Sequence, residues 1–361
     1  MKITIIGAGN GGQAMAGHFA ILGHEITLYN RTLEKLTGVI EADGITLREA
    51  INGFGKLCAV TSDLEEAVSG ANLIMITTTA DAHKELASKL APFVEENQVI
   101  VLNPGRTLGA LEFSNEIKKH TNKRLYIAEA QSLIYACRVE SPAVVRVIGV
   151  KDKVLLAAYP ATDTDHVIEI LNDIFPCFIK VENILVTSLE NIGAIFHPAV
   201  VIFNAAAIER GEMFFFYNDM TPAIAQFLEQ IDKERIAVGT AFGIKLNSVS
   251  EWVSLAYRNI EGNDLCEKMR NNPAYYQILA PKQLDTRLLT EDVPTGILPI
   301  LELGKAAGLE MPLMTAICNL SGSILNKNFH ITGRTLRNLG LENLSLQQIA
   351  DLISGNQSDS D

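Results

Sequence analysis

The fold is decided by the segment from Lys2 to Arg31, which reads KITIIGAGNGGQAMAGHFAILGHEITLYNR. Its first five residues and residues 25–29 are short apolar runs rich in β-branched side chains, and each predicts a buried strand. Between them, a glycine-rich turn leads into apolar residues at helical spacing. A strand, a glycine turn, a helix and a second strand in this order predict the first unit of a Rossmann fold.

The glycines predict a dinucleotide site. In this motif the first glycine makes the tight turn, the second lets the backbone approach a pyrophosphate, and the third lets helix and strand pack closely. The helix N-terminus offers free N–H groups and a partial positive charge to the phosphates. The second strand ends where this fold places the residue that contacts the adenosine ribose. The residues expected to bind the cofactor here are Gly7, Gly9, Asn10, Gly11, Gly12, Asn30 and Arg31.

Polar residues follow the later strands of the N-terminal half. Residues 73–76 and 99–102 read as buried strands, and open α/β sheets bind ligands at the carboxyl ends of their strands. We therefore expect Thr78, Ala80 and Asn103 to face the cofactor. Arg138 lies shortly after another predicted strand, and its guanidinium suits a carboxylate. An exposed surface arginine explains this residue equally well.

The sequence pattern changes near Glu182, where helical periodicity replaces alternation. We predict a Rossmann domain at residues 1–182 and an all-α domain at residues 183–361, with a disordered tail at residues 354–361. The first long helix of the second half is apolar nearly all round and hence buried. His197 and Asn204 share one face of it, beside Pro198, which removes a helical hydrogen bond. A ligand-facing histidine and a buried structural histidine both fit this pattern.

The composition excludes several classes of partner. The chain has 361 residues, 48% of them hydrophobic and 20% charged, which suits a soluble protein of two domains. A net charge of −12 argues against nucleic acids and anionic membranes as partners. The five cysteines have no metal-ligand spacing, and no signal peptide precedes the first strand, so we expect a cytoplasmic protein without a metal site. The longest apolar stretch, residues 192–208, is too short to span a bilayer.

Taken together, the motifs resemble those of the bacterial opine dehydrogenases in the octopine and nopaline dehydrogenase superfamily. The Rossmann glycines are shared by many families, whereas the combination of the other segments is specific. The resemblance extends from Gly7 to about Gly340. Its specific segments are Asn103-Pro104-Gly105, Gly109-Ala110-Leu111-Glu112-Phe113, Ala136-Cys137-Arg138, His197-Pro198, residues 232–236, Ser250-Glu251-Trp252, Asn272-Pro273-Ala274-Tyr275 and Glu291-Asp292-Val293.

The resemblance implies a reaction and its residues. The family joins the amino group of an amino acid to the carbonyl of a 2-oxo acid and reduces the imine with a nicotinamide hydride. The positions that match its catalytic pair are His197 and Asp292, although Asp292 also suits the cap of a following helix. An imidazole moves protons in both directions near neutral pH, and a carboxylate on its other nitrogen fixes the tautomer. Both substrates carry a carboxylate, and the substrate-binding candidates are Arg138, Cys137, Asn204 and Arg287.

The expected cofactor follows from one difference between this chain and the family that it resembles. A close relative in the family has an aspartate at the end of the second strand, where this chain has Asn30 and Arg31. An aspartate binds the 2′-OH of NAD, whereas an arginine accommodates the 2′-phosphate of NADP. We therefore expect NADP to be preferred, with NAD as the alternative.

Two other functions stay open at this point. The first is a ketopantoate reductase-like or 2-hydroxy acid dehydrogenase; many of these use a lysine early in the helical domain, and here no lysine occurs between Lys180 and Lys233. The second is a dinucleotide-sensing protein without catalysis. We also expect a homodimer, because apolar helical domains often dimerise.

Overall fold

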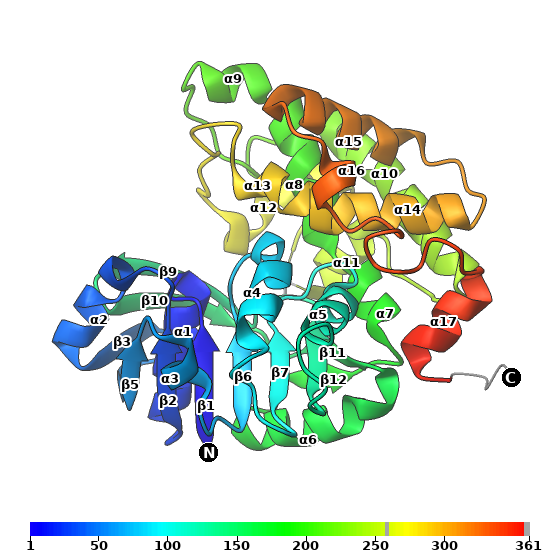
Figure 1. Cartoon of the computed structure of the whole chain (residues 1–361). Helices are drawn as coiled ribbons and strands as arrows, with labels where there is room; N and C mark the ends of the chain where they lie inside the picture. Colours follow the sequence, from blue (N-terminus) through cyan, green and yellow to red (C-terminus); the bar gives the residue numbers. More distant parts are fainter. Residues whose placement is uncertain (257–259, 357–361) are drawn as a thin grey trace, which may run out of the picture. The chain divides into compact units, whose positions relative to one another are not determined.

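The computed structural model describes residues 1–256 and 260–356, and the chain divides into two compact units (Figure 1). Unit 1 comprises Met1–Ser188 together with the chain from Asp351 onward, and unit 2 is Leu189–Ala350. The sequence placed this boundary at Glu182 and assigned the C-terminal segment to the helical domain. Within the tail expected to be disordered, Ser354 is the last residue of a helix, and residues 357–361 lie outside the described residues.

Unit 1 is built on an eight-stranded sheet of order β12-β11-β8-β7-β6-β1-β2-β5. Its strands are β1 (Lys2–Ile6), β2 (Glu25–Tyr29), β5 (Ala59–Thr61), β6 (Leu73–Ile76), β7 (Val99–Leu102), β8 (Tyr126–Ala130), β11 (Val154–Tyr159) and β12 (Phe178–Lys180). All pairs are parallel except β8 with β11. The chain moves outward from β1 to β2 on one side and to β6 on the other, which is the switch point where such sheets bind dinucleotides. The predicted Rossmann fold is confirmed.

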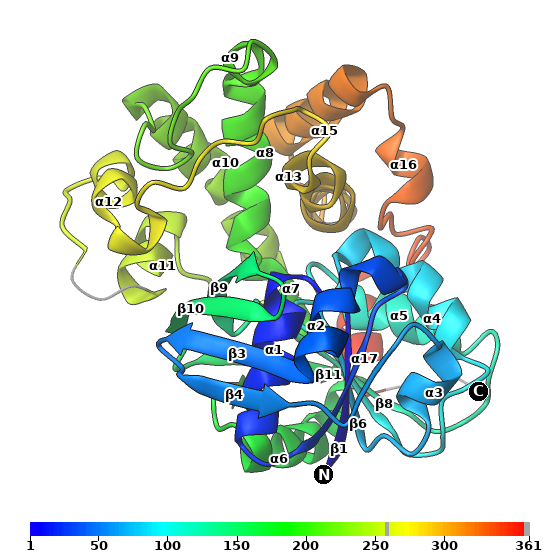
Figure 2. The ribbon, with the colours of Figure 1, turned by 90° about the vertical axis from the view of Figure 1, so that its left-hand side faces the viewer.

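A second sheet of four strands was not predicted. Its strands are β3 (Gly44–Glu49), β4 (Gly53–Lys56), β9 (Tyr135–Ser141) and β10 (Val144–Val150), in the order β4-β3-β10-β9. This sheet packs over helix α1 (Asn10–Ile21) (Figure 2). The approach is close, since a Cβ on Gly55 would lie 2.3 Å from the carbonyl oxygen of Gly17. Helix α1 is therefore buried between two sheets, which explains why its sequence is apolar and small nearly all round.

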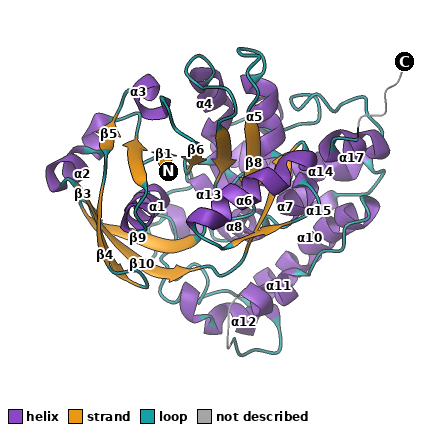
Figure 3. Ribbon diagram, turned by 90° about the horizontal axis from the view of Figure 1, so that it is seen from below, coloured by secondary structure: helices purple, strands orange, loops and turns teal. Residues whose placement is uncertain are grey.

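The remaining helices of unit 1 cover the eight-stranded sheet. Figure 3 shows α4 and α5 on one face and α1 with α6 on the other. These helices and their shorter neighbours are α2 (Thr37–Ala42), α3 (Leu64–Val68), α4 (His83–Leu90), α5 (Gly109–Ile117), α6 (Thr164–Ile174) and α7 (Ile184–Leu189), while the last helix, α17 (Leu346–Ser354), begins in unit 2 and ends in unit 1.

Unit 2 is helical, as predicted, and its central element is α8. Its helices are α8 (Ile192–Phe203), α9 (Ala205–Glu209), α10 (Pro222–Ala241), α11 (Val249–Ala256), α12 (Leu265–Asn271), α13 (Arg287–Thr290), α14 (Leu298–Ala306), α15 (Pro312–Leu325) and α16 (Phe329–Thr332). Helix α8 contacts α10, α13 and α15. The segment Ile184–Phe203 is long and apolar enough to cross a membrane, but 83% of its most apolar window is buried inside the protein, as in a core helix.

Candidate active site

The glycine loop of unit 1 has the backbone that its sequence predicts. Gly7 has a φ of +109°, which side chains disfavour. A Cβ on Gly12 would lie 1.7 Å from the carbonyl oxygen of Gly7, so helix and strand approach only because residue 12 lacks a side chain. A Cβ on Gly9 would meet no atom within 4 Å, which leaves space beside the loop for a phosphate. A Cβ on Gly11 would lie 2.7 Å from the side chain of Leu133.

Two asparagines fix this loop in place. Asn10 accepts a hydrogen bond from the backbone N–H of Val139 at 2.8 Å. Asn30 accepts from the N–H of Ala8 at 3.2 Å and donates to the carbonyl of Thr32 at 3.0 Å. Both side chains therefore hold the protein's own backbone around the predicted cofactor site.

Arg31 has no such internal role. Its side chain is exposed, and within residues 1–256 and 260–356 it makes no hydrogen bond or ion pair. The guanidinium that follows β2 is therefore available to an anionic ligand.

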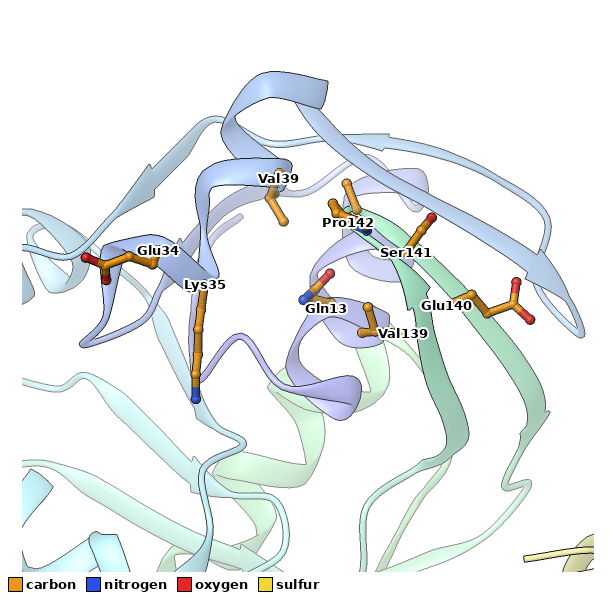
Figure 4. Close-up of a pocket in the computed structure, with 10 residues that line it drawn as sticks. Gln13, Glu34, Lys35, Val39, Val139, Glu140, Ser141 and Pro142 are labelled. Atoms are coloured by element: carbon orange, nitrogen blue, oxygen red, sulfur yellow. The ribbon is translucent and has the colours of Figure 1, made fainter. Parts of the chain in front are cut away.

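A pocket of about 320 Å³ lies between α1, α2 and the turn from β9 to β10. Figure 4 shows Gln13, Val39, Val139 and Pro142 converging on it, while the carboxylates of Glu34 and Glu140 point away. Gln13 is buried, and its amide donates to the carbonyl of Ala8 at 2.9 Å. The wall of this pocket thus stabilises the conformation of the glycine loop.

Unpaired polar groups lie at the carboxyl ends of β6 and β7. Asn103 is fully buried, and neither polar atom of its side chain has a partner among the described residues. The hydroxyl of Thr78 is also buried and unpaired there, and Ala80 is buried at the start of a single helical turn. Buried polar groups in native proteins are nearly always hydrogen-bonded. These groups, together with the open glycine loop, fit a polar ligand such as a nicotinamide dinucleotide.

Glu129 holds the loop that follows Asn103. It is fully buried at the end of β8, and it accepts hydrogen bonds from the N–H of Ala110 at 2.8 Å, the hydroxyl of Thr187 at 2.6 Å and the hydroxyl of Ser188 at 3.1 Å. A Cβ on Gly105 would lie 2.4 Å from the Cβ of Glu129. The sequence analysis gave Glu129 no role, although a lone carboxylate in an apolar strand end is a signal that such a group has buried donors.

In unit 2 the structure brings His197 and Asp292 together. Nδ1 of His197 lies 2.8 Å from Oδ2 of Asp292, which is fully buried. His197 lies on α8, and Asp292 precedes the π-helical turn Val293–Ile297. The turn lies close to α8, since there is no room for a side chain at Gly296: an added Cβ would lie only 2.5 Å from the Cβ of Ala194. The side chain of Asp292 makes no capping hydrogen bond to this turn, so the cap interpretation of Asp292 is wrong.

Tyr217 completes this arrangement. Its hydroxyl lies 3.1 Å from Nε2 of His197, and its ring stacks on Tyr275 with centroids 4.1 Å apart. With Asp292 ionised, its carboxylate only accepts hydrogen bonds, so Nδ1 carries the proton and Nε2 accepts from Tyr217. Three side chains from distant segments therefore form one hydrogen-bonded series. Tyr217 was not predicted from the sequence, because the aromatic run at residues 214–217 is typical of a core.

The four predicted substrate-binding residues have different surroundings. Arg138 is exposed on β9, whereas the Cys137 side chain is buried in the core and its thiol pKa is raised to about 11 by burial. The carbonyl of Cys137 accepts from Nη1 of Arg138 at 2.8 Å. Asn204 follows the last residue of α8 and donates to the carbonyl of Val200 at 2.9 Å. The side chain of Arg287 is 59% exposed, and its guanidinium lies 3.3 Å from the carboxylate of Glu291.

Comparison with known proteins covers both units. Residues 180–325 match the α-helical domain of NAD/NADP octopine/nopaline dehydrogenase, and residues 2–127 match the N-terminus of NAD-dependent glycerol-3-phosphate dehydrogenase. An opine dehydrogenase of Arthrobacter sp. (strain 1C) is 34% identical over 356 residues, which are 97% of this chain and 98% of that protein.

Solved structures share the fold over the whole chain. Octopine dehydrogenase with NADH and L-arginine matches with a TM-score of 0.82 and 20% identity, covering 100% of both chains. Yersinopine dehydrogenase with NADP⁺ bound matches with a TM-score of 0.73 and 13% identity, covering 98% of both chains.

Proposed function

Because this chain belongs to the octopine/nopaline dehydrogenase family and is an NAD(P)-dependent opine dehydrogenase, we propose which of its residues condense an amino acid with a 2-oxo acid and reduce the product. The observation that carries this proposal is the hydrogen-bonded series of Asp292, His197 and Tyr217. A histidine held on one nitrogen by a buried carboxylate is a proton-transfer group with a fixed tautomer.

The proposed proton transfers centre on Nε2 of His197. The amine must be deprotonated before it attacks the carbonyl of the 2-oxo acid, and in this proposal the Tyr217 hydroxyl takes that proton as it gives its own to Nε2. The resulting carbinolamine loses water only if its oxygen is protonated, and the imidazolium returns the proton there. Asp292 stabilises the charged ring between these steps. When bound, the reduced nicotinamide cofactor supplies the hydride that converts the protonated imine, left by the loss of water, into a secondary amine.

The substrate carboxylates need cationic partners. Arg287 precedes Asp292 by five residues, and its exposed guanidinium has one long contact to Glu291, which supports a role in holding a carboxylate. Arg138 is the second candidate, with its guanidinium oriented by the backbone of Cys137. In this proposal Cys137 acts through its carbonyl rather than through its buried thiol. Asn204 remains a substrate-binding proposal from its position on the face of α8 that carries His197.

For the cofactor we propose that NADP is preferred and that NAD is also used. The support is the free guanidinium of Arg31 and the two asparagines that hold the glycine loop. Gly7, Gly9, Gly11 and Gly12 shape the phosphate site in this proposal, and Thr78, Ala80 and Asn103 line the nicotinamide end.

Two properties of the whole protein are also proposed. We propose a cytoplasmic location, because all five cysteines are free thiols and four of them are buried. We propose a homodimer because unit 2 exposes large apolar side chains, among them Phe203, Leu320 and Ile324. Light scattering on a sizing column tests the second proposal, and a monomeric mass at all concentrations would contradict it.

The test of function is a substrate screen with product identification. The full-length protein is incubated with NADPH or NADH and a grid of amino acids and 2-oxo acids, and products are identified by mass spectrometry. We expect cofactor oxidation to require one member of each class and to yield a secondary-amine dicarboxylate. A hydroxy acid formed at the same rate without any amine would identify a 2-hydroxy acid dehydrogenase instead. Cofactor binding without oxidation for every pair would identify a sensor protein.

A further inference from the structure

Three loops of unit 1 meet at the carboxyl edge of the eight-stranded sheet. The loop after β7 joins β8 through the N–H of Gly105, which donates to the carbonyl of Ala130. The loop after β8 joins the end of β10 through the N–H of Lys151, which donates to the carbonyl of Ile134. Arg106, Ser132 and Lys151 belong to these three loops.

Lys151 is a cation without a counterion in the described part of the chain. Its ammonium donates to the hydroxyl of Ser132 at 2.8 Å, and it forms no ion pair with a carboxylate there. Burial, followed by the positive charge of Arg106, lowers the pKa of Lys151 to about 8. The side chain of Lys151 is half-buried, and a cation that has lost part of its water is stabilised by an anionic partner. An anionic ligand would supply that partner.

Ser132 adds a second donor at the same place. Its oxygen accepts from Lys151, and its O–H has no acceptor among residues 1–256 and 260–356. A hydroxyl accepts and donates at the same time, and its hydrogen rotates to suit a ligand. One oxyanion can thus receive hydrogen bonds from both side chains.

We propose that Lys151 and Ser132, beside Arg106, form a binding site for a carboxylate of a substrate. This inference rests on the proposed function, in which each substrate carries a carboxylate. The cofactor pyrophosphate is the other oxyanion to consider. It belongs at the glycine loop after β1, and β8 is three strands away from β1, about 14 Å at the usual strand spacing. The loop after β8 nevertheless reaches the glycine loop, where the side chain of Leu133 lies against Gly11, so the test must distinguish a substrate carboxylate from the pyrophosphate.

The test uses Lys151→Met and Ser132→Ala in the full-length protein, with Lys153→Met as the matched control. Lys153 is an exposed lysine in the same loop as Lys151. Each active substrate pair is compared with its carboxylate-free counterparts, an amine in place of the amino acid and an aldehyde in place of the 2-oxo acid. Calorimetry measures the dissociation constant of NADPH. It also measures, in the presence of NADPH, the dissociation constant of oxamate, a pyruvate analogue that cannot be reduced.

We expect Lys151→Met to lower kcat/KM about 10- to 100-fold for one carboxylate-bearing substrate, the usual worth of a hydrogen bond to a charged group. This loss of kcat/KM should disappear when that substrate is replaced by the amine or aldehyde that lacks its carboxylate. The replacement that removes the loss shows whether Lys151 binds the amino acid or the 2-oxo acid. Ser132→Ala should lose less, and Lys153→Met and the NADPH affinity of every variant should match wild type.

Two results would overturn the inference. A weaker affinity for NADPH with unchanged substrate dependence would assign the site to the pyrophosphate. Equal behaviour of Lys151→Met and Lys153→Met in both kinetics and oxamate binding would remove Lys151 from the site altogether. A wild-type protein that forms no secondary amine would contradict the proposed function, whereas the binding of oxamate and of the amino acids, each measured by calorimetry in the presence of NADPH, would still decide the role of Lys151.

Discussion

The hydroxyl of Tyr217 lies 3.1 Å from Nε2 of His197, the nitrogen on the opposite side of the ring from Asp292. The imidazole is thus held at both nitrogens. For Tyr217→Phe we expect kcat to fall about tenfold with little change in KM, since the ring loses one of two positioning hydrogen bonds. Steady-state kinetics with saturating substrates measures this. Faster turnover in the variant would mean that the hydroxyl competes with substrate for Nε2.

A larger loss of turnover is expected when the catalytic pair, His197 and Asp292, is changed. His197→Ala should lower kcat by about 10²–10⁴-fold, the usual worth of a positioned acid–base group. Asp292→Asn should also slow turnover, because an amide selects the wrong tautomer and does not stabilise imidazolium. The dissociation constant of NADPH is the control and should stay near the wild-type value. Near wild-type turnover of His197→Ala would exclude His197 from catalysis.

Arg31 is expected to set the cofactor preference. Arg31→Ala should weaken NADPH binding by about 1.5–3 kcal/mol, the worth of a hydrogen bond to a charged group, and should leave NADH binding nearly unchanged. Fluorescence titration of both cofactors measures the difference, with Arg48→Ala as an exposed-arginine control on β3. Equal losses for the two cofactors would show that Arg31 does not contact the 2′-phosphate.

His18 predicts how the stability of unit 1 depends on pH. It is buried on α1 with Nδ1 2.9 Å from the hydroxyl of Tyr135, and burial lowers its pKa from 6.5 to about 4. Between these values the unfolded chain binds more protons than the folded one, so stability falls as pH drops from 6.5 to 4. The loss is on the order of 3 kcal/mol.

Urea unfolding at pH 7 and at pH 4.5 tests this prediction with wild type and His18→Gln, which keeps a polar side chain but does not titrate. The wild type should lose more stability than the variant between the two conditions. Parallel losses in both proteins would place the acid sensitivity at other groups.

The parts of the protein that the sequence predicted are those set by local rules. The turn at Gly7 and the close packing at Gly12 depend on residues within a few positions of each other, so the strand, loop and helix could be predicted directly. Strand β9 was missed because it pairs with β10, which in turn pairs with β3 nearly a hundred residues earlier. Such pairing leaves little trace in a local pattern.

In the candidate site, too, the features that depend on contacts between distant segments could not be predicted from the sequence. Asp292 has a sequence context that fits a helix cap, and only tertiary packing places its carboxylate on His197 instead. Tyr217 and Lys151 carry no motif, because their significance comes from one hydrogen bond each to a residue on another segment. Cys137 and Arg138 were predicted together, but neighbouring residues of a strand point to opposite faces.

The C-terminal segment gives the cofactor-binding unit a discontinuous sequence, since the chain leaves unit 1 at Ser188 and rejoins it at Asp351. Ile353 is fully buried there, and a Cβ on Gly355 would lie 3.1 Å from the side chain of Pro160. During translation the ribosome must synthesise all of unit 2 before this segment emerges. The core of the Rossmann unit is therefore incomplete until the chain beyond unit 2 has been made. A fragment that ends at Ser188 would leave part of its own core surface exposed to water.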